Sequence, residues 1–254
     1  FSKGALAVCT EVNPSVPSIN GIRDAYDLEK LLGRGSVGVV YKARRREDDR
    51  KVVVKLRSVF DKEVARCCRQ EFEVLRRLSH PNIISAVEFL ELQNEAALIF
   101  EYCCDMTLQS MVKQSFPGGF PSATLKPLSK MLCDAVDYLH KRRIVHRDIK
   151  PENVLVSDSL TSLWLADFNT AYQLMDGWAL TMTGTMDYSA PEVLHDESPS
   201  EKADIWSLGL SLHFMAIGKL PRRLGDFQDL SAFSAAVLKP VKFNEPEWDP
   251  IDES

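Results

Sequence analysis

The chain has 254 residues, of which 45% are hydrophobic and 26% are charged. This length and composition can supply a sizeable core for one large domain or for two lobes, so we expect a globular protein. The formal net charge of -5 and the isoelectric point near 5.6 give no overall basic character for nucleic acid or anionic membranes. We therefore expect neither a nucleic-acid partner nor a membrane partner.

Features of secreted or membrane proteins are missing from the sequence. No apolar run approaches the roughly 18 to 20 residues that span a bilayer, and the initial FSKGALAVC has too short an apolar core for a signal peptide. The six cysteines match neither a zinc spacing nor a secreted disulfide framework. These observations predict reduced thiols and a cytoplasmic protein, with the nucleus as the alternative location.

The first part of the chain predicts strands and one helix. Residues 1–22 mix proline, serine and asparagine without a regular period, which predicts a leader or linker before a domain over residues 23–254. From Tyr26 to Lys55, two apolar runs surround a glycine-rich turn and a β-branched run follows, so we expect three strands. Over residues 61–78, apolar side chains recur every three to four positions, which predicts an amphipathic helix.

The remainder turns mostly helical after one more strand. That strand is expected at residues 96–102, and the apolar face of a second helix covers residues 128–139. Residues 203–218 are apolar on nearly all sides, which predicts a buried helix. Strands first and helices later predict an α+β, bilobal fold, with a small β-rich N-lobe over about residues 23–102 and a larger helical C-lobe over about 103–254.

The segment GRGSVGVV places Gly33, Gly35 and Gly38 between two predicted strands. Glycines let backbone amides approach phosphate oxygens because no Cβ atom stands in the way. A dinucleotide-binding fold is disfavoured, since its glycines lead into a helix. By itself, this pattern fits an ordinary glycine-containing hairpin turn equally well.

Lys55 ends the run VVVK, seventeen residues after Gly38. A lysine there is ordinarily a solvated residue, but an ammonium at a strand end can bind the α- and β-phosphates of a nucleotide if a carboxylate from the following helix fixes its position. Glu71 and Glu73 are the candidates. We favour Glu71 because it lies one turn before Leu75, on the side of the apolar face.

The motif HRDIKPENVL is far more specific. Phosphoryl transfer to an alcohol needs a carboxylate to accept the hydroxyl proton, a cation near the transferred group and oxygen ligands for magnesium. Asp148, Lys150 and Asn153 supply these groups within six residues. Asp167, nineteen residues after Asp148, adds a second hard oxygen ligand of the kind that magnesium prefers.

Together these motifs resemble the eukaryotic protein kinase family, over about residues 26–218. The resemblance is carried in chain order by GRGSVGVV, VVVK, Glu71, HPNII, HRDIKPEN, DFN, GTMDYSAPE and DIWSLG. It implies that the three glycines cover the phosphates of ATP and that Lys55 pairs with Glu71. Asp148 would be the catalytic base, and Asn153 and Asp167 would hold Mg²⁺.

The same resemblance implies an adenine site between the lobes. Four apolar side chains would enclose the base, Phe100 would be the gatekeeper, and Glu101 and Cys103 would offer backbone hydrogen bonds. Val53 replaces the commoner alanine and should narrow this site by its two additional methyl groups. The residues expected here are Leu32, Val40, Val53, Phe100, Glu101, Cys103 and Leu155.

Lys150 and Thr185 resemble the serine/threonine branch of the family. Arg147 looks like the arginine that binds a phosphate on the activation segment, with Thr181 as the best-placed acceptor and Thr183 as the second. A phosphate dianion opposite a guanidinium forms charge-assisted hydrogen bonds, which would order the segment. Protein substrates and an upstream activating kinase are therefore the expected partners.

Two departures from the family pattern bear on activity. Asn169 replaces the glycine of DFG, but asparagine readily adopts left-handed backbone angles, so we interpret it as a restriction on movement. By this resemblance, the chain is also expected to stop before the last helices of the family's C-lobe, where an arginine usually pairs with the glutamate of APE, here Glu192. This predicts apolar surface beneath that lobe, and poor solubility or weak activity of the 254-residue form alone.

The sequence favours an active enzyme, because the residues that perform the chemistry, Lys55, Glu71, Asp148, Asn153 and Asp167, are all present. We expect transfer of the ATP γ-phosphoryl group to Ser/Thr hydroxyls of proteins. The alternative is a pseudokinase that binds nucleotide or partners and acts as a scaffold or allosteric regulator. A kinase of small molecules is disfavoured, because GTMDYSAPE resembles the peptide-docking segment of protein kinases.

Overall fold

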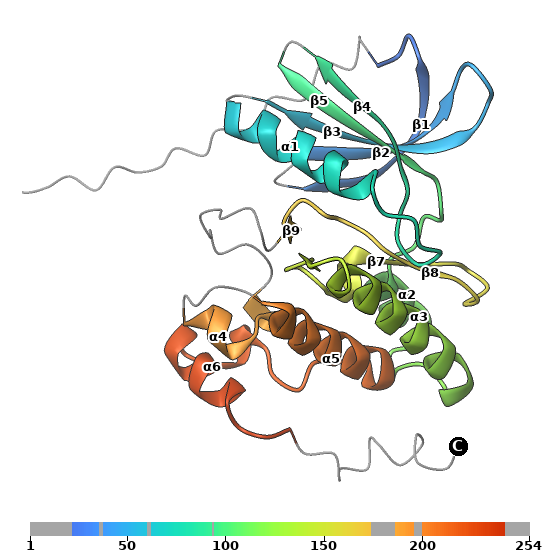
Figure 1. Ribbon diagram of the computed structural model, residues 1–254. Coiled ribbons are helices and arrows are strands. Elements are labelled where there is room, and N and C mark those ends of the chain that lie inside the picture. Colours follow the sequence, from blue (N-terminus) through green and yellow to red (C-terminus); the bar gives the residue numbers. More distant parts are fainter. Residues whose placement is uncertain are drawn as a thin grey trace, which may run out of the picture.

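The computed structural model describes residues 22–35, 38–59, 62–92, 94–173, 186–195 and 200–241. Figure 1 shows a β-sheet with one helix in the upper lobe and a mostly helical lower lobe. This arrangement is the α+β, bilobal architecture that the order of the elements predicted. Most of the predicted leader, residues 1–21, lies outside the described residues.

The N-lobe contains one antiparallel sheet of five strands in the order β1-β2-β3-β5-β4. The strands are β1 (Tyr26–Gly35), β2 (Gly38–Arg45), β3 (Lys51–Ser58), β4 (Ala86–Leu92) and β5 (Glu95–Glu101). The first three and β5 correspond to predicted strands. β4 was not predicted; its segment, AVEFLEL, pairs along β5, and that pairing supplies the backbone hydrogen bonds that an isolated strand would lack.

The two faces of this sheet contact different partners. Alternate residues of β3, among them Val54 and Leu56, pack into an outer core with Ile22 and Tyr26. Ile22 is fully buried there, so the N-lobe core begins inside the range assigned to the leader. The other face meets α1 (Lys62–Leu75), which begins one residue after the expected start and ends three residues before the expected end.

The C-lobe is built around two long helices, α3 and α5, which pack against each other. Its helices are α2 (Leu108–Ser115), α3 (Ser122–His140), α4 (Pro191–Leu194), α5 (Glu201–Ile217) and α6 (Leu230–Val237). Its short strands are β6 (Ile144–Val145), β7 (Val154–Val156), β8 (Leu163–Leu165) and β9 (Tyr172–Gln173), and β6 pairs with β9 and β7 with β8. The 3-10 turns are η2 (Pro151–Asn153), η3 (Met186–Tyr188) and η4 (Leu224–Asp226).

Local chemistry sets the ends of α5. The Ser200 side chain accepts a hydrogen bond from the backbone N–H of Lys202, as an N-cap does. At the other end, Gly218 has φ 77°, and a Cβ there would lie 2.1 Å from the carbonyl oxygen of Pro117. Glycine ends the helix because it alone combines this left-handed angle with so close an approach.

One hydrophobic core joins the two lobes. It combines Cys68, Leu75 and Phe100 of the N-lobe with Leu128 and Phe168 of the C-lobe. Segments that carry the sequence motifs, among them α1 with Glu71 and the segment with Asp167, therefore pack against a common core.

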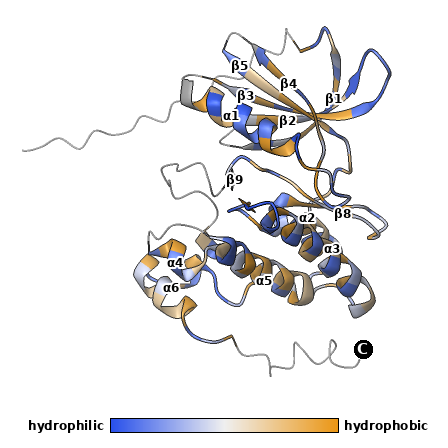
Figure 2. Cartoon of the chain, viewed as in Figure 1, coloured by the Kyte–Doolittle hydropathy of each residue, from blue (hydrophilic) through white to orange (hydrophobic). Residues whose placement is uncertain are grey.

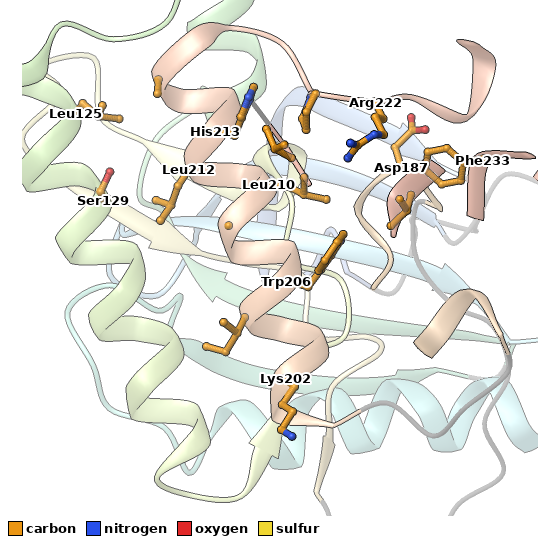
Figure 3. A pocket seen from close by; sticks show the side chains of 16 residues that line it. Leu125, Ser129, Asp187, Lys202, Trp206, Leu210, Leu212, His213, Arg222 and Phe233 are labelled. Carbon is orange, nitrogen blue, oxygen red and sulfur yellow. The ribbon is translucent and has the colours of Figure 1, made fainter. Parts of the chain in front are cut away.

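The prediction that the segment around α5 is buried on nearly all sides was wrong for one side. Figure 2 shows hydrophobic residues along much of α5, yet Ile205 is 54% exposed and Gly209 is exposed. Both line a largely apolar cavity of about 630 Å³ between α5, α3 and α6 (Figure 3). Within the described residues, the indole N–H of Trp206, in the same cavity, is buried without a hydrogen-bond partner.

Within the described ranges, no helix is both long and apolar enough to cross a bilayer.

Candidate active site

Lys55 ties together three elements at the junction of the lobes. Its Nζ donates to Oε1 of Glu71 on α1 at 2.8 Å and to Oδ1 of Asp167, two residues after β8, at 2.7 Å. Glu73, the other candidate partner, instead forms a surface ion pair with Arg76 at 2.6 Å. The fold therefore brings Glu71 to the lysine and directs Glu73 to solvent.

Burial and charge compete at this cluster. Burial lowers the pKa of Lys55, but the attraction of Glu71 and Asp167 outweighs it, so the net pKa of the ammonium lies above 10.5. Burial raises the pKa of Asp167, and the charge and hydrogen bond of Lys55 more than reverse that effect. Lys55 and Asp167 are therefore both charged at neutral pH.

The loop around η2 forms a second cluster centred on Asp148. Lys150 Nζ lies 2.9 and 2.7 Å from the two carboxylate oxygens of Asp148. Asn153 Nδ2 donates to Oδ2 of the same carboxylate at 2.7 Å and to the Asp148 carbonyl at 2.8 Å. Because these bonds use Nδ2 of Asn153, its Oδ1 is the side-chain atom that can ligate a metal.

Asp204, near the start of α5, positions the loop that carries Asp148. Its carboxylate accepts hydrogen bonds from the backbone N–H groups of His146 and Arg147, both at 2.8 Å, and lies 2.9 Å from Nε2 of His140. Asp204 is only 1% exposed. From the sequence alone, DIWSLG had no assigned role beyond the resemblance; a carboxylate at the start of the mostly apolar run 203–218 was the available signal.

The segment after β8 is held by packing and hydrogen bonds. The ring of Phe168 contacts that of His146 edge-on, with centroids 4.7 Å apart. His146 Nε2 lies 3.1 Å from the carbonyl of Ala166, and Thr170 Oγ1 donates to the His146 carbonyl at 2.9 Å. These contacts place Asp167 beside Lys55.

Asn169, the departure from DFG, is not strained in this conformation. The positive φ of the segment is at Asp167, with φ 61°, and Asn169 is not among the described residues with positive φ. Its Oδ1 is buried and has no hydrogen-bond partner within the described residues. Any restriction that Asn169 imposes on movement would therefore appear in another conformation of the segment.

Four of the predicted adenine residues meet at the core that the two lobes share, namely Val53, Phe100, Cys103 and Leu155. Val53 pairs with Phe100 across β3 and β5, and Val53, Cys103 and Leu155 all pack against the core shared by the lobes. Leu32 and Val40 are partly buried on β1 and β2, and Glu101 has an exposed side chain. Burial raises the pKa of the Cys103 thiol to about 12, which fits a packing role better than a reactive one.

The glycine-rich hairpin closes through Gly35 and Gly38, which face each other across β1 and β2. The two residues at its tip, 36 and 37, lie outside the described residues. A Cβ added at Gly33 would meet nothing within 4 Å, so the protein itself leaves that position open.

A polar network that the sequence did not predict connects the strands of this hairpin with the segment after β5. Lys42 Nζ donates to the hydroxyl of Tyr102 at 3.0 Å, and that hydroxyl donates to Asp105 at 2.8 Å. Lys30 on β1 donates to the other carboxylate oxygen of Asp105 at 2.8 Å. β1 and β2 are therefore linked to residues 102–105.

The predicted regulatory residues are only partly described. Thr181, Thr183 and Thr185 lie outside the described residues, so the roles proposed for them stay predictions. Arg147 has φ 70° and is held by Asp204 through its backbone. Glu192 is half-buried in the first turn of α4, and none of the ion pairs within the described ranges involves it.

The oxygen donors suit magnesium. Asn153 and Asp167 offer an amide oxygen and a carboxylate, which are hard ligands. Within the described residues, no group of three or more His, Cys, Asp or Glu side chains could hold a metal ion by itself. Magnesium is commonly held by one or two protein ligands together with water and substrate phosphates, so a pair of donors fits that ion.

A protein-kinase-domain model matches residues 26–254 of the chain. The chain belongs to the protein kinase family. This kinase is 32% identical over 239 residues to a calcium/calmodulin-dependent protein kinase type 1 of Macrobrachium nipponense, covering 92% of this chain and 68% of the relative. It is 32% identical over 236 residues to human serine/threonine-protein kinase DCLK3, covering 90% and 36%. It is 37% identical over 207 residues to CBL-interacting protein kinase 12 of Oryza sativa subsp. japonica, covering 77% and 37%.

These comparisons confirm the predicted family and fold class. They support a serine/threonine protein kinase and do not favour the pseudokinase alternative. Members of this family use ATP and Mg²⁺ and act on proteins. The chain spans about a third of the length of two of the three relatives, so the substrates and partners of a whole protein are a matter for proposal.

Proposed function

We propose that this kinase transfers the γ-phosphoryl group of ATP to serine and threonine hydroxyls of protein substrates, with the residues described above in the roles predicted for them. The observation that carries the proposal is the pair of charged clusters. Lys55 lies between Glu71 and Asp167, and Asp148 lies between Lys150 and Asn153. Such an arrangement can bind phosphates, hold a divalent ion and accept a proton.

Asp148 is proposed as the catalytic base. Its carboxylate would orient the substrate hydroxyl and accept its proton. Lys150 contacts both carboxylate oxygens and would place a positive charge beside the transferred phosphoryl group. The hydrogen bonds from Asn153 and the anchoring of the loop by Asp204 keep this carboxylate in one orientation before substrate arrives.

On the nucleotide side, Lys55 would bind the α- and β-phosphates, with Glu71 holding its ammonium in place. Backbone amides of Gly33, Gly35 and Gly38 would cover the phosphates. Mg²⁺ held by Asn153 and Asp167 would neutralise phosphate charge that builds up during transfer. The adenine would lie among Leu32, Val40, Val53, Phe100 and Leu155, with hydrogen bonds to the backbone of Glu101 and Cys103.

The proposal extends to regulation. Phosphorylation of Thr181, or of Thr183, by an upstream kinase would order the activation segment through Arg147, because a phosphate dianion forms charge-assisted hydrogen bonds with a guanidinium. We also propose a cytoplasmic location, with the nucleus as the alternative, because the sequence has no apparent signal peptide and its cysteines do not match a secreted disulfide framework.

The test is ATP-dependent phosphorylation of a mixed protein substrate in the presence of magnesium. Asp148→Asn should lower kcat by about 10²- to 10⁴-fold while ATP binding persists, because an amide of the same size cannot accept the hydroxyl proton and Asp148 is not a proposed nucleotide ligand. Asp167→Ala should remove magnesium-dependent turnover. Asp137→Asn, which changes an exposed carboxylate on α3, is the matched control and should act like the wild type.

Equal background signal in the wild type and both site variants would contradict the proposal. Retained ATP binding in that case would favour the pseudokinase alternative.

A further inference from the structure

Arg57 is an unusual buried cation next to the proposed phosphate-binding lysine. It lies two residues after Lys55 on β3 and is only 9% exposed. Residues two apart on a strand share a face, so Arg57 and Lys55 both face α1 and not the outer core. The glycine-rich hairpin lies close by, because a Cβ added at Gly38 would be 3.1 Å from Arg57 Cγ.

The guanidinium faces the same carboxylate as Lys55. Nη1 of Arg57 lies 3.8 Å from Oε2 of Glu71, while Lys55 Nζ lies 2.8 Å from Oε1. Cys68, one turn before Glu71, also lies in the field of the guanidinium: burial raises the pKa of its thiol, and Arg57 opposes that rise. One buried carboxylate therefore has a different cation on each of its oxygens.

Some polar atoms of Arg57 and Glu71 lack hydrogen-bond partners within the described residues. Within the described residues, Arg57 Nε, Arg57 Nη1 and Glu71 Oε2 are buried and have no hydrogen-bond partner. Buried charged groups are costly unless they are paired and hydrogen-bonded. The unpaired donor and the unpaired acceptor are neighbours, and an approach of about 1 Å would give a charge-assisted hydrogen bond of ordinary length.

A second cation near Glu71 would balance the charges in the cluster, because Lys55 has more than one anionic partner. In this conformation Lys55 serves both Glu71 and Asp167. The next step rests on the proposed function, in which Lys55 binds phosphates of ATP. Lys55 would then divide its charge between the nucleotide and Glu71, and Glu71, whose side chain is fully buried, would need compensation from another group.

We infer that Arg57 is a second cationic anchor of Glu71: a positioning residue that holds the carboxylate against β3 and leaves Lys55 free to bind phosphates. An apolar side chain could fill the same space between the hairpin and α1. It could not attract the Glu71 carboxylate, however. An electrostatic role and a purely space-filling role of Arg57 therefore predict different results when Arg57 is replaced.

A double-mutant cycle in chemical unfolding separates the two roles. Arg57→Met keeps an unbranched stem beneath Gly38 and removes the charge, and Glu71→Gln removes the opposite charge. Arg57→Met should lower the folding equilibrium constant about tenfold or more in the wild-type background. In the Glu71→Gln background it should change the constant little or raise it, because the arginine there is a buried cation without its carboxylate.

A kinetic comparison supplies the second readout. Arg57→Met should raise the KM for ATP about three- to tenfold with a smaller change in kcat, because Glu71 would then draw Lys55 away from the phosphates. Arg57→Lys, which restores a cation, should recover part of that loss. This comparison requires no Glu71 variant, so it decides the question even where Glu71→Gln does not fold.

Equal loss of stability from Arg57→Met in both backgrounds would overturn the inference, as would coupling with unchanged KM and kcat in an active enzyme. The unfolding cycle uses no ATP. A wild type without turnover but with the predicted coupling would therefore contradict the proposed function and still support the anchor.

Discussion

At the scale of single residues, the buried carboxylate of Asp204 positions the catalytic loop although Asp204 is not itself a proposed catalytic or binding residue. It accepts the backbone N–H groups of His146 and Arg147 and thereby fixes the loop that carries Asp148. Arg147 is held with φ 70°, an angle that most residues avoid. The cost of this backbone conformation is offset by hydrogen bonds to a charged acceptor.

We expect Asp204→Ala to destabilise the fold and to lower kcat. The substitution removes the acceptor of the buried N–H of His146, at about 1 to 3 kcal/mol, and of the partly buried N–H of Arg147, and it lets Asp148 move. The KM for ATP should change less, because Lys55 and Glu71 do not contact Asp204. Urea unfolding and steady-state kinetics measure both effects.

Asp204→Asn keeps one acceptor oxygen and should give intermediate losses. Wild-type stability of Asp204→Ala would show that the loop is held by other contacts.

At the scale of elements, the glycine-rich hairpin contains glycines with different physical roles. Gly38 has φ 148°, and a Cβ there would lie 2.1 Å from the carbonyl oxygen of Leu56 on β3. Gly33 has open space around its Cα, so its lack of a side chain matters for what approaches from outside the protein. The sheet requires the missing side chain of Gly38, whereas we propose that the missing side chain of Gly33 makes room for the nucleotide.

Gly38→Ala and Gly33→Ala form a matched pair. Gly38→Ala should lower the free energy of unfolding by roughly 1 to 3 kcal/mol, because the strand must shift and a strained angle must be kept. Gly33→Ala should change it by less than about 1 kcal/mol, yet raise the KM for ATP because a methyl group would meet the phosphates. Equal losses of stability for the two variants, measured by chemical unfolding, would contradict this assignment.

At the scale of the whole molecule, the ion pair between Lys55 and Asp167 joins the lobes, because one partner lies on β3 and the other follows β8. The contribution of this ion pair to the free energy of unfolding depends on pH under both acid and alkaline conditions. The folded-state pKa of Asp167 lies below its ordinary 3.8, so its stabilisation is present above pH 3.8 and is lost as the pH falls through the folded value. The pKa of Lys55 lies above 10.5, so its stabilisation is present below pH 10.5 and is lost as the pH rises through the folded value.

Unfolding free energies measured between pH 3 and pH 7 should therefore fall less steeply toward acid in Asp167→Asn than in the wild type. The reason is that the variant has no carboxylate whose proton binding is linked to folding. Asp137→Asn is the control for loss of a carboxylate. Identical acid slopes for the wild type and Asp167→Asn would show that this pair contributes nothing to pH-dependent stability.

The sequence by itself determined the lobes, most of the long elements and the identity of the reacting groups. The hydrophobic periods that predict strands and helices are local properties of the chain. The residue types and spacing of the motifs around Asp148 and Asp167 likewise indicate phosphoryl transfer. β4 and α2 were not predicted. A short strand such as β4 takes its stability from pairing along β5, and α2 rests on contacts with η2 and β7.

Only the tertiary structure decided which charges meet. It brought Glu71 to Lys55 and sent Glu73 to solvent, it placed Asp204 beneath the loop of Asp148, and it put Arg57 on the far oxygen of Glu71. Such pairings depend on how strands and helices pack over long separations in sequence, which local patterns do not contain. The chemistry of the site can be named from residue types, but its charge balance exists only after the lobes have folded together.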